Sequence, residues 1–374
     1  MLFLYIIAIP IVICLGNFLI FRKRVTMGEI LFQVGGILLI MAISVFGCSA
    51  GKKSDTEVLN GTVTSKARHE VGCRHSYKCH CYTTTDCYGS GKDRHCSTTE
   101  HCQTCYDHAY DVDWDVYANY GMSNTDFSVS TIDRQGLKEP PRWTQFAVGD
   151  PYMTTHGYDN YVKANAETIY KTHGYQIRYK NFIPAYPMSI SDYHTRLDRV
   201  VVVGNVVVPD IAAWNADLTN LNKVIGPKKQ CNIVIIMTPG LSEEYYYALK
   251  EAWIGGKKND IIVIIDVATD GSIKWSNTLS WAKEDMVRVK LRDDIMAIGK
   301  LDRVAIIKVI GEDVDKYFRR KSMKEYKYLD KAIILSDNEF MWLFIFAIML
   351  SIGISVLVDM VDFEGGSGSF SSLG

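Results

Sequence analysis

The chain has 374 residues and a formal net charge of −1, from 41 lysines and arginines against 42 aspartates and glutamates. This length allows two or three domains. A net charge near zero gives no reason to expect binding to nucleic acid, which a strongly basic surface would favour.

Three apolar segments have the length and composition of transmembrane helices. The first covers about residues 2–21 without a charge, which is long enough to cross a bilayer core of about 30 Å as a helix. The second covers about residues 30–46, and the third covers residues 339–359. A core helix of this length normally shows a polar face, and none of the three segments has one. We therefore expect three membrane-spanning helices.

Basic residues indicate the orientation of these helices. Residues 22–24 (Arg-Lys-Arg) lie in the short connection between the first two segments, and basic residues in short loops favour the cytoplasmic side. Lys52 and Lys53 favour the opposite orientation, but they border a large domain. We expect a transmembrane hairpin over residues 1–47 and a flexible Gly/Ser tail over residues 360–374. The large domain is then extracytoplasmic, and it is periplasmic if the chain is bacterial or phage-encoded.

Cys48 supports a different interpretation of the N-terminal region. The sequence VFGC at residues 45–48 follows an apolar run and resembles a lipoprotein signal, with cleavage and lipidation at the cysteine. This alternative leaves the first apolar segment unexplained, so we prefer the transmembrane hairpin.

The segment from His75 to His108 holds six cysteines and five histidines. Outside the cytoplasm, dense cysteines in a small irregular segment usually form disulfides. Seven is an odd number of candidates, so one thiol stays free or pairs with Cys48 or with another chain. The disulfide candidates are Cys73, Cys79, Cys81, Cys87, Cys96, Cys102 and Cys105.

Zinc is an alternative for the same segment, although our preferred prediction contains no cofactor. Two closely spaced cysteine pairs supply four thiolates to a tetrahedral ion, and a histidine can replace one of them. A thioredoxin-like redox pair is not supported, because the flanking βαβ pattern is missing. The candidate zinc ligands are Cys79, Cys81, Cys102 and Cys105, with His80 or His101 as substitutes.

Residues 48–198 are expected to form a cysteine-rich, mostly-β module. Residues 111–120 alternate apolar and polar side chains, which is typical of a half-buried strand, and residues 125–132 repeat the pattern. Residues 138–146 contain two adjacent prolines, which argue against a helix there.

Residues 199–330 have a different pattern. Three apolar, β-branched runs at residues 199–208, 231–240 and 259–267 have the composition of strands buried on both faces. Helical segments at residues 209–226 and 242–256 separate them, and Ser242 and Gly255 are expected to cap the second. Two further amphipathic segments cover residues 287–299 and 304–318. This order indicates an α/β sandwich, and the fold class is an α+β membrane protein.

The α/β segment resembles the TPM-domain family. The resemblance is carried by an apolar strand, PDIAAWNADLTNLNKVIG at residues 209–226 and CNIVIIMTPGLSEEYYYALKEAWIGGKKNDIIVIIDV at residues 231–267. Family members have a helix that ends in a Trp-Gly-x-Gly-like turn, a Lys-rich loop and a strand opened by a polar residue. The residues at those places are Trp253, Gly255, Gly256, Lys257, Lys258, Asn259 and Asp260. The similarity covers about residues 200–330 and the tail, and the cysteine-rich module resembles uncharacterised membrane proteins of bacteria and phages.

The resemblance implies two alternative functions. Some family members are assigned phosphatase activity and calcium binding, and others are assembly or repair factors of membrane complexes. A hard cation needs several converging oxygen ligands, and here the acids that could supply them are Asp210, Asp266 and Asp270, with Glu284 and Asp285. The family's glycine-rich turn would fall near residues 273–281 and is missing from the sequence. No Ser-His-Asp arrangement, phosphate-binding glycine loop or HExxH motif is present either.

We therefore expect a non-enzymatic, membrane-anchored scaffold or assembly factor that binds copies of itself or another membrane protein. The alternative is an extracytoplasmic, divalent-cation-dependent phosphatase of the TPM type. In the third apolar segment Ala347, Ser351 and Ser355 recur every four residues, and small residues at this spacing allow close packing of helices in lipid. That face contacts either another copy of the chain or the small surface of Gly35 and Gly36 in the second segment.

Overall fold

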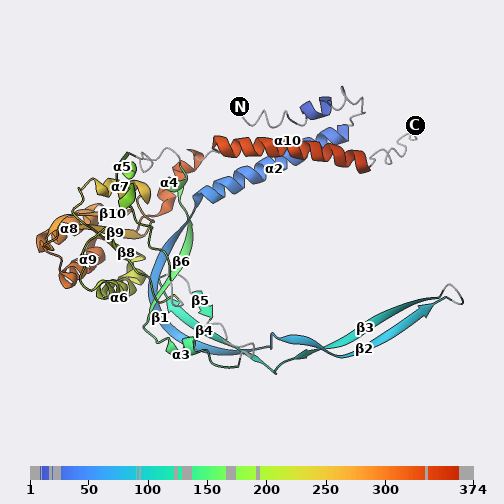
Figure 1. Cartoon of the computed structure of the whole chain (residues 1–374), viewed down its shortest axis with the longest axis horizontal. Coiled ribbons are helices and arrows are strands. Elements are labelled where there is room, and N and C mark those ends of the chain that lie inside the picture. The colour runs from blue at the N-terminus through green and yellow to red at the C-terminus, as the bar shows by residue number, and fades with distance from the viewer. Residues whose placement is uncertain are drawn as a thin grey trace. The chain divides into compact units, whose positions relative to one another are not determined.

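The computed structural model describes residues 9, 11–16, 19, 27–89, 91, 94–121, 125–128, 137–165, 174–190, 194–332 and 336–361. The chain forms two compact units, and most of their elements are labelled in Figure 1. The helical unit consists of Met1–Asp55, Gly157–Thr168 and Met323–Gly374, and the sheet unit consists of Thr56–His156 and Ile169–Ser322.

Two long helices dominate the helical unit. Helix α2 covers Met27–Lys53 and helix α10 covers Asp337–Val361, and both are long and apolar enough to cross a membrane. They match the second and third predicted segments. The first predicted segment, residues 2–21, lies mostly outside the described residues, as do residues 22–24 and the tail after Val361. The described chain therefore contains two candidate spans where the sequence predicts three.

Most apolar side chains of these two helices are exposed. Phe46 on α2 is 76% exposed and Trp342 on α10 is 65% exposed. Two short elements, α4 (Tyr161–Ala164) and the 3-10 helix η4 (Met323–Ala332), also belong to the helical unit.

The first sheet of the sheet unit has four strands in the order β5-β4-β1-β6. The strands are β1 (Ser54–Val71), β4 (Asp111–Asn119), β5 (Thr125–Ser128) and β6 (Pro151–Asp159). The predicted alternation in β4 is confirmed, since Val112, Trp114 and Val116 are all buried. The second predicted strand, residues 125–132, is a strand only over Thr125–Ser128, and its remaining residues lie outside the described chain.

The two prolines that argued against a helix proved compatible with one. Helix α3 covers Pro141–Gln145, with Pro140 just before it and Pro141 within its first turn. Proline is tolerated in the first helical turn because its missing N–H would have no partner inside the helix there. The prediction that this segment contains no helix is therefore wrong.

The second sheet has the order β10-β9-β8-β7. Strands β7 (Val200–Val202), β8 (Asn232–Thr238) and β9 (Asp260–Val267) are parallel, and β10 (Ile273–Ser280) is antiparallel to β9. Four helices accompany this sheet: α6 (Ile211–Lys229), α7 (Tyr245–Ala252), α8 (Met286–Ile298) and α9 (Arg303–Tyr317). Short helical turns, α5 (Gly174–Arg178) and η3 (Lys180–Phe182), precede it.

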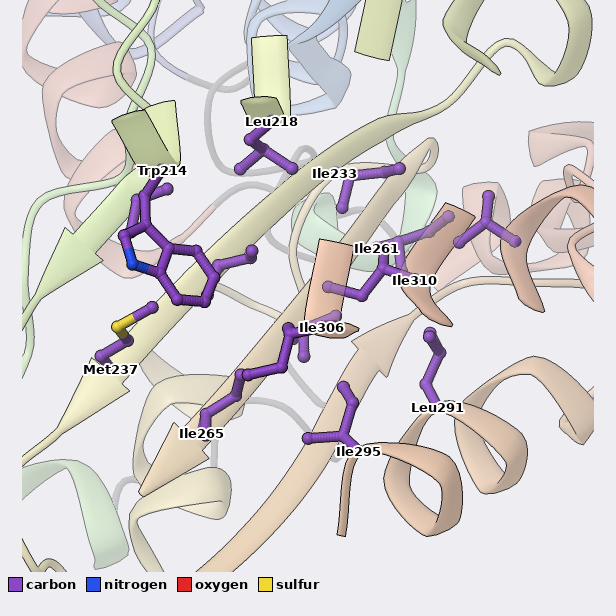
Figure 2. Packing of buried hydrophobic residues seen from close by; sticks show 14 of the residues in the cluster. Trp214, Leu218, Ile233, Met237, Ile261, Ile265, Leu291, Ile295, Ile306 and Ile310 are labelled. Carbon is purple, nitrogen blue, oxygen red and sulfur yellow. The ribbon is translucent and has the colours of Figure 1, made fainter. Parts of the chain in front are cut away.

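Alternate residues of the central strands face two separate cores. Ile233 and Met237 of β8 and Ile261 and Ile265 of β9 pack with α6, α8 and α9 on one face, as Figure 2 shows. The intervening residues, such as Val234 and Ile264, pack with α7 on the other face. Every residue of β8 and of β9 is buried, which explains why these strands lack the alternation of a half-exposed sheet. The predicted α/β sandwich is confirmed in outline.

Two boundaries and one strand differ from the sequence-based expectation. The apolar run at residues 199–208 forms only a three-residue strand, because Gly204 has a φ of 62° and turns the chain. Helix α7 begins at Tyr245 without a side-chain cap, since the Ser242 hydroxyl hydrogen-bonds to the Tyr179 hydroxyl at 2.8 Å. Strand β10 was not predicted.

Candidate functional site

Strands β2 (Ser76–Tyr88) and β3 (His95–Tyr106) form a two-stranded antiparallel sheet of their own, which we call the ribbon. Among the described residues no further strand pairs with it, and no side chain of either strand is buried. An isolated two-stranded hairpin is marginally stable at best in water. The ribbon therefore needs a source of stability other than a hydrophobic core.

Three disulfides cross the ribbon. They join Cys79 to Cys105, Cys81 to Cys102, and Cys87 to Cys96. Cys87 and Cys96 are directly opposite in the strand register, and a register shift between Cys79 and Tyr82 places the other two pairs. These bonds confirm the disulfide prediction for six of the seven candidates. Disulfides stabilise such an element mainly by restricting the unfolded chain.

Cys73 is the unpaired member of the seven, and its side chain is partly buried. The four cysteines proposed as zinc ligands are all sulfur partners in two of the disulfides, so they do not offer thiolates in this structure. His80 has a φ of 48° within the register shift. His101 stacks on Tyr82 with ring centroids 5.2 Å apart and contacts the Thr84 hydroxyl at 3.0 Å.

The ribbon surface is rich in exposed tyrosine. Tyr77, Tyr82, Tyr88 and Tyr106 are 53%, 62%, 74% and 57% exposed. Tyrosine is enriched at protein interfaces because it offers a large amphipathic contact area with few rotatable bonds. Two disulfide-linked strands with exposed tyrosines have the composition of a protein-binding surface.

A buried polar junction joins β1 to the α/β sheet within the sheet unit. Arg199 is 1% exposed, and its guanidinium donates to the side-chain oxygens of Asn60 on β1 and Asn232 on β8, the latter at 2.9 Å. Burial lowers the pKa of Arg199 to about 10. Asn232 also donates to Asp260 at 3.0 Å, and burial raises the pKa of Asp260 to about 6.

Glu57 is a second ionic centre of the junction, and it is fully buried. Its carboxylate lies 3.0 Å from the Lys258 ammonium, 2.5 Å from the Arg320 guanidinium and 2.9 Å from the His156 ring. Burial lowers the pKa of Lys258, while the charge of Glu57 raises it. Buried charges of this kind persist only when they are paired.

The loop that carries the TPM-like residues builds this junction. Gly255 and Gly256 have φ values of 76° and 85°, which suit glycine. Beyond them, Lys258 pairs with Glu57, and the Asn259 amide donates to the Val58 carbonyl at 2.7 Å. The residues that suggested the family therefore have a structural role in this chain.

Asp210 and Asp270, two of the predicted cation ligands, have local partners. Asp210 is the N-cap of α6 and accepts the backbone N–H of Ala213 at 3.1 Å. Asp270 is exposed in the turn before β10 and accepts the backbone N–H and the hydroxyl of Ser272.

Asp266, the third predicted ligand, is 1% exposed at the end of β9. It accepts hydrogen bonds from Thr238 at 2.7 Å and from the Leu241 N–H at 2.8 Å, and burial raises its pKa. Asp285 pairs with Arg288 on α8, and Glu284 is exposed. Within the described chain, the groups of ligand atoms close enough for one metal ion include none of these acids. The calcium site stays a prediction.

The small face of α10 packs against α2. Ala347, Ser351 and Ser355 are 3%, 0% and 6% exposed. Gly36 faces Ile354 across the pair, and a Cβ at Gly35 would have open space around it. The sequence left two interpretations of this face: contact with another copy of the chain, or contact with the chain's own second apolar segment. The described helices match the second interpretation, because this segment forms α2.

Comparison of the chain with protein-family models, with curated proteins and with solved structures finds no match. The resemblance to the TPM-domain family therefore stays a prediction that rests on the residues quoted above.

Sequence reasoning missed the residues of the polar junction. The available signal was the position of three polar residues within or beside apolar segments: Asn60, Arg199 and Asn232. A polar residue beside a buried strand needs a hydrogen-bond partner. Their partners lie far away in sequence, so the pairing itself could not be read from the local pattern.

Proposed function

We propose that the protein is a non-enzymatic scaffold, anchored in a membrane by α2 and α10, that presents the ribbon to a partner protein on the extracytoplasmic side. The observation that carries this proposal is the ribbon itself. Three disulfides connect its two strands, although neither strand has a buried side chain. Disulfides that stabilise an element outside the hydrophobic core support a role for that element at the protein surface.

Three further features support the proposal. The disulfides suit an oxidising compartment, and the exposed apolar surface of α2 and α10 suits lipid. Cross-linking also holds the strands in a binding-competent shape before contact, which lowers the conformational entropy lost on binding.

The partner surface can be mapped by site-specific photo-cross-linking in the cells that express the full-length chain. A photoreactive amino acid in place of Tyr82 or Tyr88 on the ribbon should give one discrete adduct, identified by mass spectrometry. Val304 on α9 is 66% exposed and is the matched control outside the ribbon. Adducts at Tyr82 that equal those at Val304, or none at either tyrosine, would contradict the proposal.

A phosphatase assay tests the alternative directly. The purified chain should not hydrolyse a generic phosphomonoester with either calcium or magnesium. Metal-dependent turnover that Asp210→Asn abolishes would replace the scaffold with the enzyme.

A further inference from the structure

Three potential metal ligands lie together at the base of the ribbon. Val71 ends β1 and faces Asp111, the first residue of β4, in the register of that antiparallel pair. Cys73 follows β1, and His108 lies in the connection between β3 and β4. One ligand atom from each of Cys73, His108 and Asp111 lies within 4.8 Å of the other two.

Three polar atoms of this cluster have no hydrogen bond among the described residues. Asp111 is 5% exposed, and among the described residues its Oδ1 has no hydrogen-bond partner. Both ring nitrogens of His108 are buried and equally unpartnered within the described chain. The His108 Nδ1 lies 3.3 Å from Asp111 Oδ1, an ion-pair distance without hydrogen-bond geometry. Buried polar atoms without partners are costly, and one bound cation would satisfy Asp111 Oδ1 and one of the two His108 ring nitrogens.

The distances suit tetrahedral zinc. Zinc binds nitrogen and oxygen ligands at about 2.0 Å, so a tetrahedral angle places two such atoms about 3.3 Å apart. The observed separation of His108 Nδ1 and Asp111 Oδ1 is 3.3 Å. A thiolate bound at about 2.3 Å would lie about 3.6 Å from each of them. The Cys73 sulfur lies within 4.8 Å of a ligand atom of each of the other two residues.

The surroundings also suit a metal site. The second oxygen of Asp111 accepts the backbone N–H of Arg74 at 2.6 Å, which orients the carboxylate as outer contacts do in metal sites. An open pocket of about 570 Å³ adjoins the cluster, and it leaves room for a water molecule as a fourth ligand. The pocket is lined by Gly72, Cys73, Tyr106, His108 and Ala109. A sulfur, nitrogen and oxygen donor set favours zinc over calcium or magnesium, which prefer oxygen ligands.

We propose that Cys73, His108 and Asp111 bind one zinc ion at the base of the ribbon, with the fourth position open to the adjoining pocket. The ion would connect the segment that precedes the ribbon, which contains Cys73, to the segment that follows it, which contains His108 and Asp111. This site is distinct from the six cysteines of the three ribbon disulfides, and it does not depend on what the ribbon binds.

The full-length chain in mild detergent, stripped with a chelator and never reduced, tests the proposal. Zinc addition should give one bound ion per chain by elemental analysis. Cobalt(II) in its place should give a sulfur-to-cobalt charge-transfer absorption, which reports the Cys73 thiolate. Bound zinc should also slow alkylation of Cys73 and leave alkylation of Cys48 unchanged.

Matched variants assign the ligands. Cys73→Ser and His108→Gln should each weaken zinc binding at least about tenfold, the lower bound for loss of even an outer-shell partner. Cys48→Ser and His95→Gln, which change the same residue types elsewhere, should bind as the unaltered chain does. Mass mapping of the three ribbon disulfides in each variant checks that the module has folded.

Three results would overturn the proposal. The first is an unaltered chain that takes up no zinc and gives no cobalt absorption. The second is full affinity in both Cys73→Ser and His108→Gln. The third is Cys73 held in a disulfide between two chains in freshly isolated protein, because a disulfide sulfur is not a thiolate ligand.

Discussion

The side chains of Gln33 and Ser351 hydrogen-bond to each other between α2 and α10, where both are fully buried: the serine hydroxyl donates to the Gln33 Oε1 at 2.6 Å. The Gln33 amide then donates to the Ser355 hydroxyl at 2.7 Å. In lipid, hydrogen bonds between helices contribute about 0.6 kcal/mol each on average. One glutamine therefore connects both small polar residues of the face that the sequence marks for helix packing.

Ser351→Leu combined with Ser355→Leu should lower the thermal stability of the detergent-solubilised chain without changing its particle size. The leucines are too large for the close contact, and Gln33 would lose its hydrogen bonds to the two serines. Size and melting temperature can be measured on one sample. Ile352→Leu with Val356→Leu is the matched control, since both residues are about half exposed on α10. A particle that shrinks only in the serine variant would show that the face joins two chains.

The ribbon cysteines should resist alkylation in unfolded, unreduced protein. Mass spectrometry should find Cys79, Cys81, Cys87, Cys96, Cys102 and Cys105 unmodified, and Cys48, Cys73 and Cys231 modified. The same sample reduced before alkylation provides the control. Free thiols at Cys79 and Cys102 together with bound zinc would instead support the four-cysteine zinc site.

Arg199→Ala should destabilise the sheet unit by about 3 kcal/mol in urea unfolding of the full chain. The substitution leaves the Asn60 oxygen buried without its guanidinium donor and leaves the Asn232 oxygen with only the longer hydrogen bond from the Asn60 amide, at 3.3 Å. Unsatisfied buried groups cost about 1–3 kcal/mol each. Arg196→Ala removes an exposed arginine nearby, and it should change stability by less than about 0.5 kcal/mol. Equal effects of the two changes would contradict the role of the junction.

Asp313 should make the chain less stable as the pH rises from about 4 to about 6. Burial raises its pKa from 3.8 to about 6, assisted by Asp294 on α8 and Glu312 on α9 and opposed by Lys290 and Lys316. The folded state therefore holds a proton that the unfolded state has released in this range, and stability present below pH 4 is lost.

Asp313→Asn should remove this dependence and raise the free energy of unfolding at pH 7 by about 1–3 kcal/mol, since a shift of about two pKa units corresponds to at most about 3 kcal/mol and solvent screening reduces this value. Asp293→Asn on the exposed side of α8 removes the same charge as a control. Urea unfolding at pH 4, 5, 6 and 7 gives the comparison. Parallel pH curves for the unaltered chain and Asp313→Asn would show that the carboxylate is not the cause.

A cysteine introduced as Val304→Cys should react with a membrane-impermeant thiol reagent added to intact cells. One introduced as Phe370→Cys should react only after the membrane is opened, because the basic residues 22–24 predict a cytoplasmic tail. The opposite labelling pattern would move the ribbon into a reducing compartment and contradict the scaffold proposal.

Local patterns in the sequence were sufficient for several elements. Patterns among residues that are close in sequence predicted β4, β8, β9 and the disulfides of the ribbon. These patterns are the alternation around Trp114, the apolar runs at residues 231–240 and 259–267, and the high density of cysteines. Strand β7 was overestimated because composition does not show where Gly204 turns the chain. Strand β10 was missed because residues 273–280 mix polar and apolar side chains, and their partner is the neighbouring strand β9.

The candidate sites were harder to predict than the elements. Cys73 was recognised only as a possible disulfide partner, and His108 and Asp111 were not connected to it. These residues meet because β1 pairs with β4, although all residues of the ribbon lie between these two strands in the sequence. The contact is therefore long-range. The junction of Asn60 with Arg199 has the same origin, since 139 positions separate the two residues.

The nested order of the ribbon disulfides has a consequence for biosynthesis. Cys79 and Cys81 are synthesised first, but their partners follow 26 and 21 residues later, whereas Cys87 has its partner only nine residues away. A chain exported from its N-terminal end therefore presents the Cys79 and Cys81 thiols to the oxidising machinery before either correct partner has emerged. Any bond formed between these two must be reshuffled, so maturation of this protein should depend on a disulfide isomerase and not on an oxidase alone.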